Sequence, residues 1–443
     1  MRAAIRKLFW ALVIVFGLLV TALVTPFLIP LKGYIPELTR LVSERIGEPV
    51  SIEDLRLQLL PTPRVAIVGL KLGRGDEVSI ERGSIVPDLS SLLSGEEVVR
   101  VVFADKVRVK ESALNLLGKL SKGGGEGRIL IRRIMLRRVT FEHRTLKLPP
   151  FNIIVDLGLT PASTVAHISS DDGTLRATLA PRGGGRLHLT VKARNWRLPF
   201  AAAPLDFEAL EVRGVLGAGR LELPEVNGRL YGGTLAGSVD TQWGREWRVA
   251  GKARIDGVKM VPLQAALGRP ARLSGRLSAE ASYSARARTP GQLISALVLN
   301  APFELAGGEW HGVDLSRAAE LRVGKMSKGG TTKFERLKGN FALRGGHIDV
   351  SKICVRSPSL TAVGNLAIAP DKTLSGRLDV SVSKTGGLVG APMQLSGTTS
   401  DPSLSLTTAG AIGAFIGTLL LPIIGTSLGL SASSSLEGKA ECK

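Results

Sequence analysis

Many short segments of this chain alternate apolar and polar residues with a period of two. The clearest are "RLHLTVKAR", "WRVAGKARI" and "RLDVSVSK". A period of two places apolar side chains on one face of a β-strand. The apolar positions concerned are Leu187, Leu189, Val191, Val249, Ile255, Leu378, Val380 and Val382. Because glycine-rich turn signals separate such segments, including "GGGEG" at 123–127 and "RGGG" at 182–185, we expect a mainly β chain of antiparallel strands joined by hairpins.

Two architectures fit a long antiparallel sheet with one apolar face. In a closed sandwich, two apolar faces pack against each other. In an open, curved half-pipe, the apolar face lines a groove and needs a guest. The low aromatic content of 5% and the many small Val, Ala and Leu side chains favour an adaptable lining. Most half-apolar sheets are nevertheless protein cores, so periodicity alone leaves both architectures open.

The N-terminal region has the composition of a membrane anchor. Residues 8–31 carry no charged side chain, and as a helix they would rise ~36 Å, enough to cross a ~30 Å hydrocarbon core. Arg2, Arg6 and Lys7 precede this run and favour a cytoplasmic N-terminus. The run is too long for a cleaved signal peptide, so we expect an uncleaved anchor. Its membrane-facing residues would include Phe9, Trp10, Val13, Phe16, Leu19 and Leu23.

A short amphipathic helix is predicted directly after the anchor. In "PELTRLVSERI", residues 36–46, the apolar residues recur at helical spacing. Gly47 follows as a helix-ending residue. We therefore expect one short helix beside the membrane before the first strand.

The C-terminal region holds a second uncharged run, residues 409–430. Glycines interrupt it and Pro422 breaks any helix near its middle, so a continuous membrane span is disfavoured. We expect a short, broken helical element that inserts into a membrane leaflet or caps the end of the sheet. The alternative is a buried helical hairpin that closes the sheet edge. The two cysteines, Cys354 and Cys442, can form one bridge in an oxidising compartment, although two free thiols fit the sequence as well.

The charge balance favours an anionic neighbour. The formal net charge is +20, and the basic residues are spread along the strands. Because signatures of RNA-binding domains and zinc sites are absent from the sequence, we expect membrane proximity and no nucleic-acid partner. A solvated, arginine-rich strand face explains the charge equally well.

No motif for catalysis stands out. The five histidines share no metal-ligand spacing, and the glycine-rich segments lack the Lys-Ser/Thr of a phosphate-binding loop. The zinc-protease motif H-E-x-x-H is also missing from the sequence. We therefore expect no enzyme activity, no catalytic or metal-binding residues and no cofactor.

The order of motifs along the chain resembles the AsmA-like family. After the anchor and short helix, Leu57, Pro61, Pro63, Val65, Ile67, Gly69 and Leu72 carry a matching pattern in "LQLLPTPRVAIVGLKL". "VPDLSSLLSGEEVVRVVF" resembles the family's next element. Residues 341–406 are similar to its C-terminal part, with Gly364, Gly397, Asp401 and Pro402 in matching places. Residues 147–299 match only in their alternation of apolar and polar residues.

This resemblance implies a Gram-negative envelope protein anchored in the inner membrane, with the bulk of the chain in the periplasm. It implies a β-groove, of the kind found in bridge-like lipid transfer proteins, that binds phospholipid on the alternating positions named above and supports outer-membrane biogenesis. The outer membrane, or a partner protein there or in the periplasm, would receive the lipid. The expected division is an anchor (1–31), an N-terminal section (32–146), a groove section (147–408) and the apolar C-terminal segment (409–443). The alternative is a structural or regulatory envelope scaffold with a closed β core.

Overall fold

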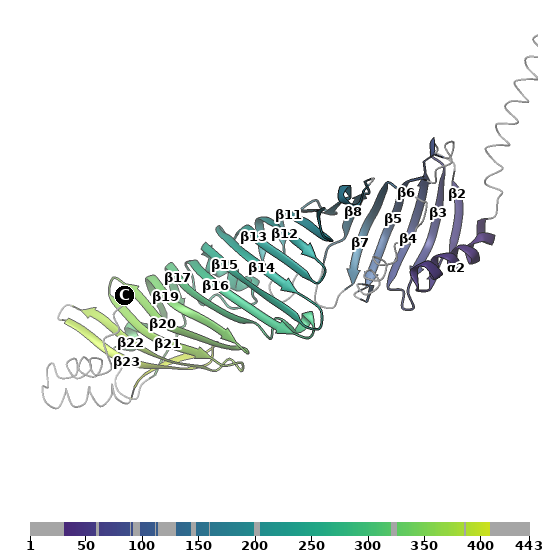
Figure 1. The fold of residues 1–443 in the computed structure, drawn as a ribbon. Helices are drawn as coiled ribbons and strands as arrows, with labels where there is room; N and C mark the ends of the chain where they lie inside the picture. The colour runs from purple at the N-terminus through teal and green to yellow at the C-terminus, as the bar shows by residue number, and fades with distance from the viewer. Residues whose placement is uncertain are drawn as a thin grey trace, which may run out of the picture. The chain divides into compact units, whose positions relative to one another are not determined.

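The alternating segments form β-strands, so the mainly β prediction is confirmed (Figure 1). The computed structural model describes residues 31–58, 62–88, 90–91, 98–110, 112–113, 130–142, 148–158, 160–198, 204–319, 326–384 and 387–407. Two compact units divide the chain. Unit 1 comprises Met1–Leu189 with Pro199–Ala201, and unit 2 comprises Thr190–Leu198 with Ala202–Lys443. The boundary predicted at residue 146 lies within unit 1.

Unit 1 begins with the short helix that the sequence predicts. The 3₁₀-helix η2 (Leu31–Tyr34) leads into α2 (Ile35–Ile46). Pro36 lies in the first turn, where its missing N–H costs no hydrogen bond. Gly47 ends the helix with a left-handed φ of 73°, and its N–H donates to the carbonyl oxygen of Ser43 at 2.8 Å. Leu38 and Leu41 remain exposed on the helix surface.

The strands of unit 1 form an antiparallel sheet with one parallel interruption. They are β1 (Val50–Ser51), β2 (Asp54–Gln58), β3 (Arg64–Leu72), β4 (Val78–Pro87), β5 (Val98–Lys110), β6 (Leu130–Ile131), β7 (Arg133–Glu142), β8 (Phe151–Asp156), β9 (Val165–Ser170), preceded by η3 (Pro161–Ser163), and β10 (Leu175–Gly183). Strand β3 pairs with β1 and β2, and antiparallel pairs run from β3 to β5 and from β7 to β10. Strand β11 (Arg186–Arg197) contains the boundary between the units.

The expectation of a purely antiparallel sheet is wrong at β5. This strand pairs in parallel with both β6 and β7. The turn predicted at "GGGEG" lies between β5 and β6, outside the described residues. Gly184 and Gly185 of "RGGG" do form a turn between β10 and β11.

A row of apolar side chains crosses the sheet of unit 1. Directly paired residues lie on the same face, so the register traces the row from strand to strand. It consists of Val65, Ile85, Val102, Ile134, Val155, Ala166 and Leu179. All of these side chains are half-buried. The alternation seen in the sequence therefore yields one continuous apolar face in this unit.

An ionic cluster ties β4, β5 and β7 together beside the parallel pairing. The buried carboxylate of Asp105 accepts a hydrogen bond at 2.8 Å from Nη2 of Arg82. Arg138 donates to the same carboxylate from Nε at 2.8 Å and also from Nη2. The hydrogen bond from Arg138, followed by that from Arg82, lowers the pKa of Asp105 although its burial opposes this.

Replacing Asp105 by asparagine should therefore destabilise unit 1 at neutral pH by roughly 1–3 kcal/mol, the range for hydrogen bonds to charged groups. Because its pKa is lowered on folding, the carboxylate stabilises the protein above its unfolded pKa of about 3.9. This contribution is lost as the pH falls through the folded-state value. Urea denaturation should show the difference between wild type and variant shrinking below about pH 4. A difference that stays constant with pH would contradict this role.

Unit 2 continues with antiparallel strands. They are β12 (Asp206–Gly217), β13 (Arg220–Leu230), β14 (Gly233–Gln242), β15 (Trp247–Lys259), β16 (Arg276–Ala287), β17 (Val298–His311), β18 (Met326–Lys328), β19 (Thr331–Arg344), β20 (His347–Ser357), β21 (Leu360–Ile368), β22 (Leu374–Lys384), β23 (Gly387–Gly397) and β24 (Pro402–Leu406). Consecutive strands pair from β12 to β17, β17 pairs with β19, and pairing continues to β24. The short helices are α5 (Met260–Ala266), η4 (Pro290–Gln292) and α6 (Leu315–Ala319).

The C-terminal end of unit 2 curls around a dry core. Strand β24 pairs with β18, which immediately precedes β19 in the chain, so the last described strand returns to the start of β19. Helix α6 packs on β22, and its Leu315 is 0% exposed. We call strands β18–β24 with α6 the packed section. Its core contains Leu337, Val355, Ala362, Leu378, Val380, Met393, Leu395 and Leu404.

Both terminal predictions fall largely outside the described residues. Of the predicted anchor, only Leu31 in η2 is among the described residues. Residues 409–430 all lie outside them. Within the part of the chain that is described, no helix has the length and apolar character needed to cross a membrane. The thiol of Cys354 on β20 is bonded in a disulfide. Because Cys442 lies beyond the described residues, its pairing with Cys354 stays a prediction.

Candidate functional site

One face of unit 2 carries apolar side chains in continuous rows across the strands. One row runs from β13 to β22 through Leu223, Val239, Gly251, Tyr283, Leu299, Leu343, Ile348, Ile368 and Leu374. A second row, beside it, consists of Leu210, Gly228, Leu235, Ile255, Ala279, Phe303 and Gly339. Cross-strand pairing therefore assembles the alternating positions of separate strands into one surface.

The opposite face of the same strands is polar. Along β15, Lys252 and Arg254 alternate with the apolar positions, and on β16 Glu280 and Ser282 lie opposite them. Arg254 forms an ion pair with Glu280 across the strands. The sheet of unit 2 thus separates an apolar side from a solvated, charged side.

The apolar side is open in one part of the unit and buried in the next. On β14 to β17, Val239, Ile255 and Leu299 keep part of their surface exposed. We call the apolar side of β13–β17, without the buried row described next, the open face. A third row on the same side runs through Val258, Leu277, Leu305, Leu337, Val355, Ala362 and Val380 into the packed section. Leu305, Val355 and Val380 in this row are at most 1% exposed.

Aromatic rings lie across glycines on the open face. Tyr283 is paired with Gly251, and a Cβ built on Gly251 would clash with the backbone carbonyl oxygen of Ser238 and, at 2.5 Å, with the Tyr283 hydroxyl oxygen. That hydroxyl donates to the carbonyl oxygen of Ser238 at 3.1 Å, and burial raises its pKa. Phe303 lies over its paired Gly339 in the same way, 3.0 Å from a built Cβ. These rings therefore lie close against the backbone of the neighbouring strand.

Replacing Gly251 by alanine should displace Tyr283 and cost roughly 1–3 kcal/mol, the usual range for overpacking. Gly244 lies in the adjacent turn with no atom within 4 Å of a built Cβ, so Gly244→Ala is a matched control that should change stability little. Urea denaturation measures both effects. Spectroscopic titration should also show the raised tyrosine pKa moving back toward its ordinary value of about 10 in Gly251→Ala. Equal stability of the two variants would contradict the packing described.

The sequence-predicted positions fall into three environments. Leu187, Leu189 and Val191 lie on β11 and are half-buried. Val249 and Ile255 lie on the open face, paired with Ala285 and Ala279. Leu378 and Val380 are 0% exposed in the packed section, so in this structure they contact other side chains of the protein and face no open surface. Val382 pairs with Leu360, and its side chain lies outside what is described.

The sequence did not predict the glycine–aromatic pairs. Nor did it predict that the apolar side of the sheet is partly exposed on β13–β17 and buried in the packed section. The glycines did carry a signal, because Gly251 occupies an apolar position of "WRVAGKARI" where a side chain is expected. The short strand β18, which brings about the curl of the packed section, carries no alternating pattern that could have revealed it. Nor could the site have been found through metal chemistry, since no cluster of three or more possible protein ligands occurs among the described residues.

Comparison with known families supports the resemblance first seen in the motifs. The model of the AsmA family matches residues 204–353, from just before β12 into β20. This range contains the whole open face. A search of curated proteins finds no match. The match over residues 204–353 supports the assignment of this chain to the AsmA-like family.

Proposed function

We propose that this protein binds phospholipid acyl chains on the open face of unit 2 and supports lipid movement between the membranes of the cell envelope. The observation that carries the proposal is the pair of apolar rows on β13–β17 whose side chains remain partly exposed. A continuous apolar surface of this kind is a common mark of an interaction site. The AsmA family match supports a role in the envelope.

The chemistry of the face suits an acyl chain. Each methylene group removed from water contributes about 0.8 kcal/mol, so ten methylenes would contribute about 8 kcal/mol before the cost of ordering the chain. The flat aromatic rings and small residues such as Ala253, Ala279 and Ala281 offer few features that would select one chain over another. Such a surface suits a guest of variable length and unsaturation.

The apolar row of unit 1 supports the same activity there. It joins β3 to β10 and is also half-buried throughout. We propose that unit 1, which follows the predicted inner-membrane anchor, takes lipid from that membrane. An outer-membrane or periplasmic partner would receive it. No enzyme activity or cofactor is part of this proposal.

A structural role is the second candidate, and one observation favours it. The packed section has a dry core with several side chains at 0% exposure, as expected of a scaffold. Under that alternative the protein would act by contact with other envelope proteins. The open face would then be covered by a protein partner.

Native mass spectrometry of the full chain, purified in an uncharged detergent, tests the proposal. We expect adducts with the masses of phospholipids that persist after detergent is removed in the gas phase. Adducts should be replaced when the protein is incubated with a phospholipid of different chain length. Protein that remains free of lipid under these conditions would overturn the proposal and favour the scaffold.

A further inference from the structure

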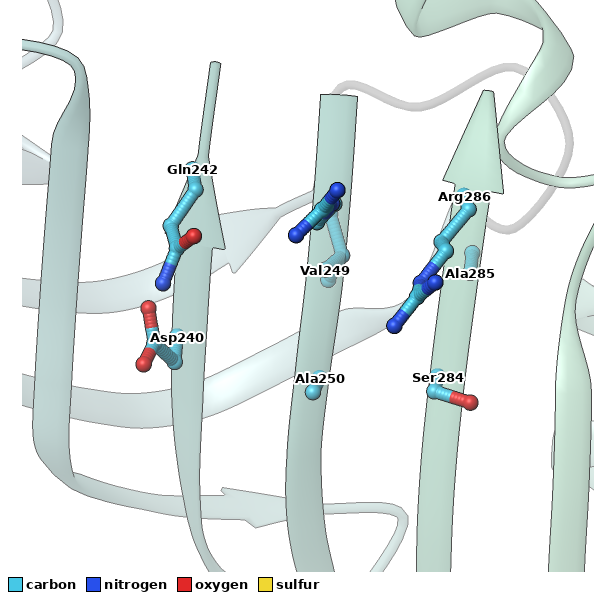
Figure 2. A pocket seen from close by; sticks show the side chains of 8 residues that line it. Asp240, Gln242, Val249, Ala250, Ser284, Ala285 and Arg286 are labelled. Atoms are coloured by element: carbon cyan, nitrogen blue, oxygen red, sulfur yellow. The ribbon is translucent and has the colours of Figure 1, made fainter. Parts of the chain in front are cut away.

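A cavity of about 300 Å³ lies where β14, β15 and β16 reach the edge of the sheet in unit 2. Its polar lining consists of Asp240, Gln242, Arg248, Ser284 and Arg286 (Figure 2). Gln242 is the last residue of β14, Arg248 the second of β15, and Arg286 the last but one of β16. These three residues therefore lie within one residue of the strand ends.

The register brings like charges together in this cavity. Arg248 is directly opposite Arg286, and Gln242 is directly opposite Arg248 on the other side. Like charges at directly opposed positions are destabilising. The arrangement becomes favourable when an anion lies between the two guanidinium groups, each of which can donate two parallel hydrogen bonds to it.

The carboxylates nearby neutralise this pair only in part. Asp240 is engaged by Arg220, whose Nη2 lies 2.6 Å from its Oδ2. Arg248 has one long contact of 3.4 Å, from its Nη2 to Oε2 of Glu246. The side chain of Arg286 has no hydrogen-bond or ion-pair partner among the described residues. Elsewhere in unit 2, the opposed pair Arg336 and Arg356 has an acidic neighbour, because Glu304 lies 2.9 Å from Nε of Arg336.

Aromatic side chains occupy the same edge of the sheet. Trp243 and Trp247 stack with ring centroids 5.8 Å apart. By strand alternation, Trp247 lies on the same side as Val249 of the open face, and Arg248 lies on the opposite side. A phospholipid with its acyl chains on the open face and its phosphate beside Arg248 would therefore pass around the strand ends with its glycerol part. Tryptophan and arginine side by side are typical of the boundary between the apolar and polar parts of a lipid.

We propose that Arg248 and Arg286 bind the phosphate group of a phospholipid whose acyl chains lie on the open face. The proposal rests on the function proposed above and names the headgroup site for it. Gln242 also lines the cavity, and its side-chain amide donates a hydrogen bond to Asp240. The shared chemistry is a tetrahedral phosphate anion, so free phosphate is the competing ligand that the experiment must separate from lipid.

The test measures binding to the full chain in an uncharged detergent. Three probes are titrated separately: short-chain dihexanoyl phosphatidylglycerol, uncharged dihexanoylglycerol and inorganic phosphate. Tryptophan fluorescence reports binding because Trp243 and Trp247 lie at the same strand ends as Arg248, where the acyl chains would pass. The double variant Arg248→Gln/Arg286→Gln should bind phosphatidylglycerol at least tenfold more weakly and dihexanoylglycerol unchanged. Inorganic phosphate should bind far more weakly than phosphatidylglycerol.

The matched control is the double variant Lys252→Gln/Arg254→Gln. It removes the same number of basic charges from the polar side of β15, away from the strand end. It should leave phosphatidylglycerol binding within about twofold of wild type. All four substituted side chains are exposed, so neither double variant should unfold the sheet. Removing the opposed like charges of Arg248 and Arg286 should, if anything, stabilise it slightly.

Three outcomes would overturn the headgroup site. Unchanged phosphatidylglycerol binding in the Arg248/Arg286 variant would exclude the two arginines. An equal loss in the control variant would assign the effect to the net charge of the polar face. Inorganic phosphate binding as tightly as phosphatidylglycerol would identify a site for free phosphate. If any of these results came with lipid adducts in native mass spectrometry, the proposed function would stand and only the headgroup site would fail.

Discussion

Replacing Val380 by glutamate should unfold the packed section. Val380 is 0% exposed and lies between Ala362 and Ala391 on the neighbouring strands. An unpaired carboxylate there must become protonated, and protonating a group with an ordinary pKa of about 4.3 at pH 7 costs about 4 kcal/mol. The lost packing of the valine adds to this cost. The total is a large fraction of the stability of a typical domain, about 5–15 kcal/mol.

The matched control is Val249→Glu on the open face. Val249 carries the same side chain but is only half-buried, so its carboxylate can stay hydrated. Hydrogen exchange read by mass spectrometry should show loss of protection in β20–β24 for Val380→Glu and near wild-type protection for Val249→Glu. Unfolding by both substitutions would mean that the face on β15 is also a core, which would favour the scaffold function.

Replacing Leu299 by glutamate should remove bound lipid from a folded protein. Leu299 is half-buried and lies in the row between Tyr283 and Leu343. A carboxylate at this position would need to lose water against an acyl chain or become protonated, and protonation at pH 7 costs about 4 kcal/mol. Since about 1.4 kcal/mol corresponds to a factor of ten, the amount of bound phospholipid should fall at least tenfold. Native mass spectrometry measures the amount.

The neighbouring residue provides the control for this prediction. Asn300 lies on the opposite side of the same strand, exposed and paired with Ser282. Asn300→Glu adds the same charge one residue away and should leave bound lipid within about twofold of wild type, because it faces water in either state. If both variants lost lipid equally, net charge would explain the effect and the face would not.

The helices and strands that were predicted correctly are those whose pattern lies within a few consecutive residues of the sequence. The helix α2 follows from the spacing of its apolar residues and from Gly47, and the strands follow from alternation in segments such as "WRVAGKARI". Bulges then shift the alternation in ways that the sequence hides. Ile255 and Val258 both face the apolar side although three positions separate them, because Gly257 adopts a φ of 65° within a bulge.

The environment of each apolar strand depends on distant residues and could not be predicted locally. "RLDVSVSK" and "RLHLTVKAR" show the same alternation of apolar and polar residues. Val380 in the first is nevertheless fully buried, whereas Val191 in the second is half-buried. What separates them is the pairing of β18 with β24, which joins residues 326–328 to residues 403–405. The parallel pairing of β5 and β7 is equally non-local. Of the two architectures left open by periodicity, the described strands form the open sheet, and its apolar side becomes buried in the packed section.

The family resemblance was confirmed, but the family model matches where the motifs were weakest. The motifs compared lay before residue 104 and after residue 340, whereas the family model matches residues 204–353. In that region apolar and polar residues alternate, but no fixed motif recurs. A strand of an open sheet needs apolar side chains on one face and no particular residue at any position.

Site-specific photocrosslinking tests most directly whether the open face binds lipid. A benzophenone amino acid is placed in turn at Leu235, Ile255 and Ala279, which are neighbours in one row on the apolar side. The matched positions Ala236, Arg254 and Glu280 are neighbours in a row on the polar side. After irradiation of full-length protein in the cell envelope, our account predicts phospholipid adducts at the first three positions and few or none at the other three. Equal crosslinking on the two sides, or none at either, would contradict it.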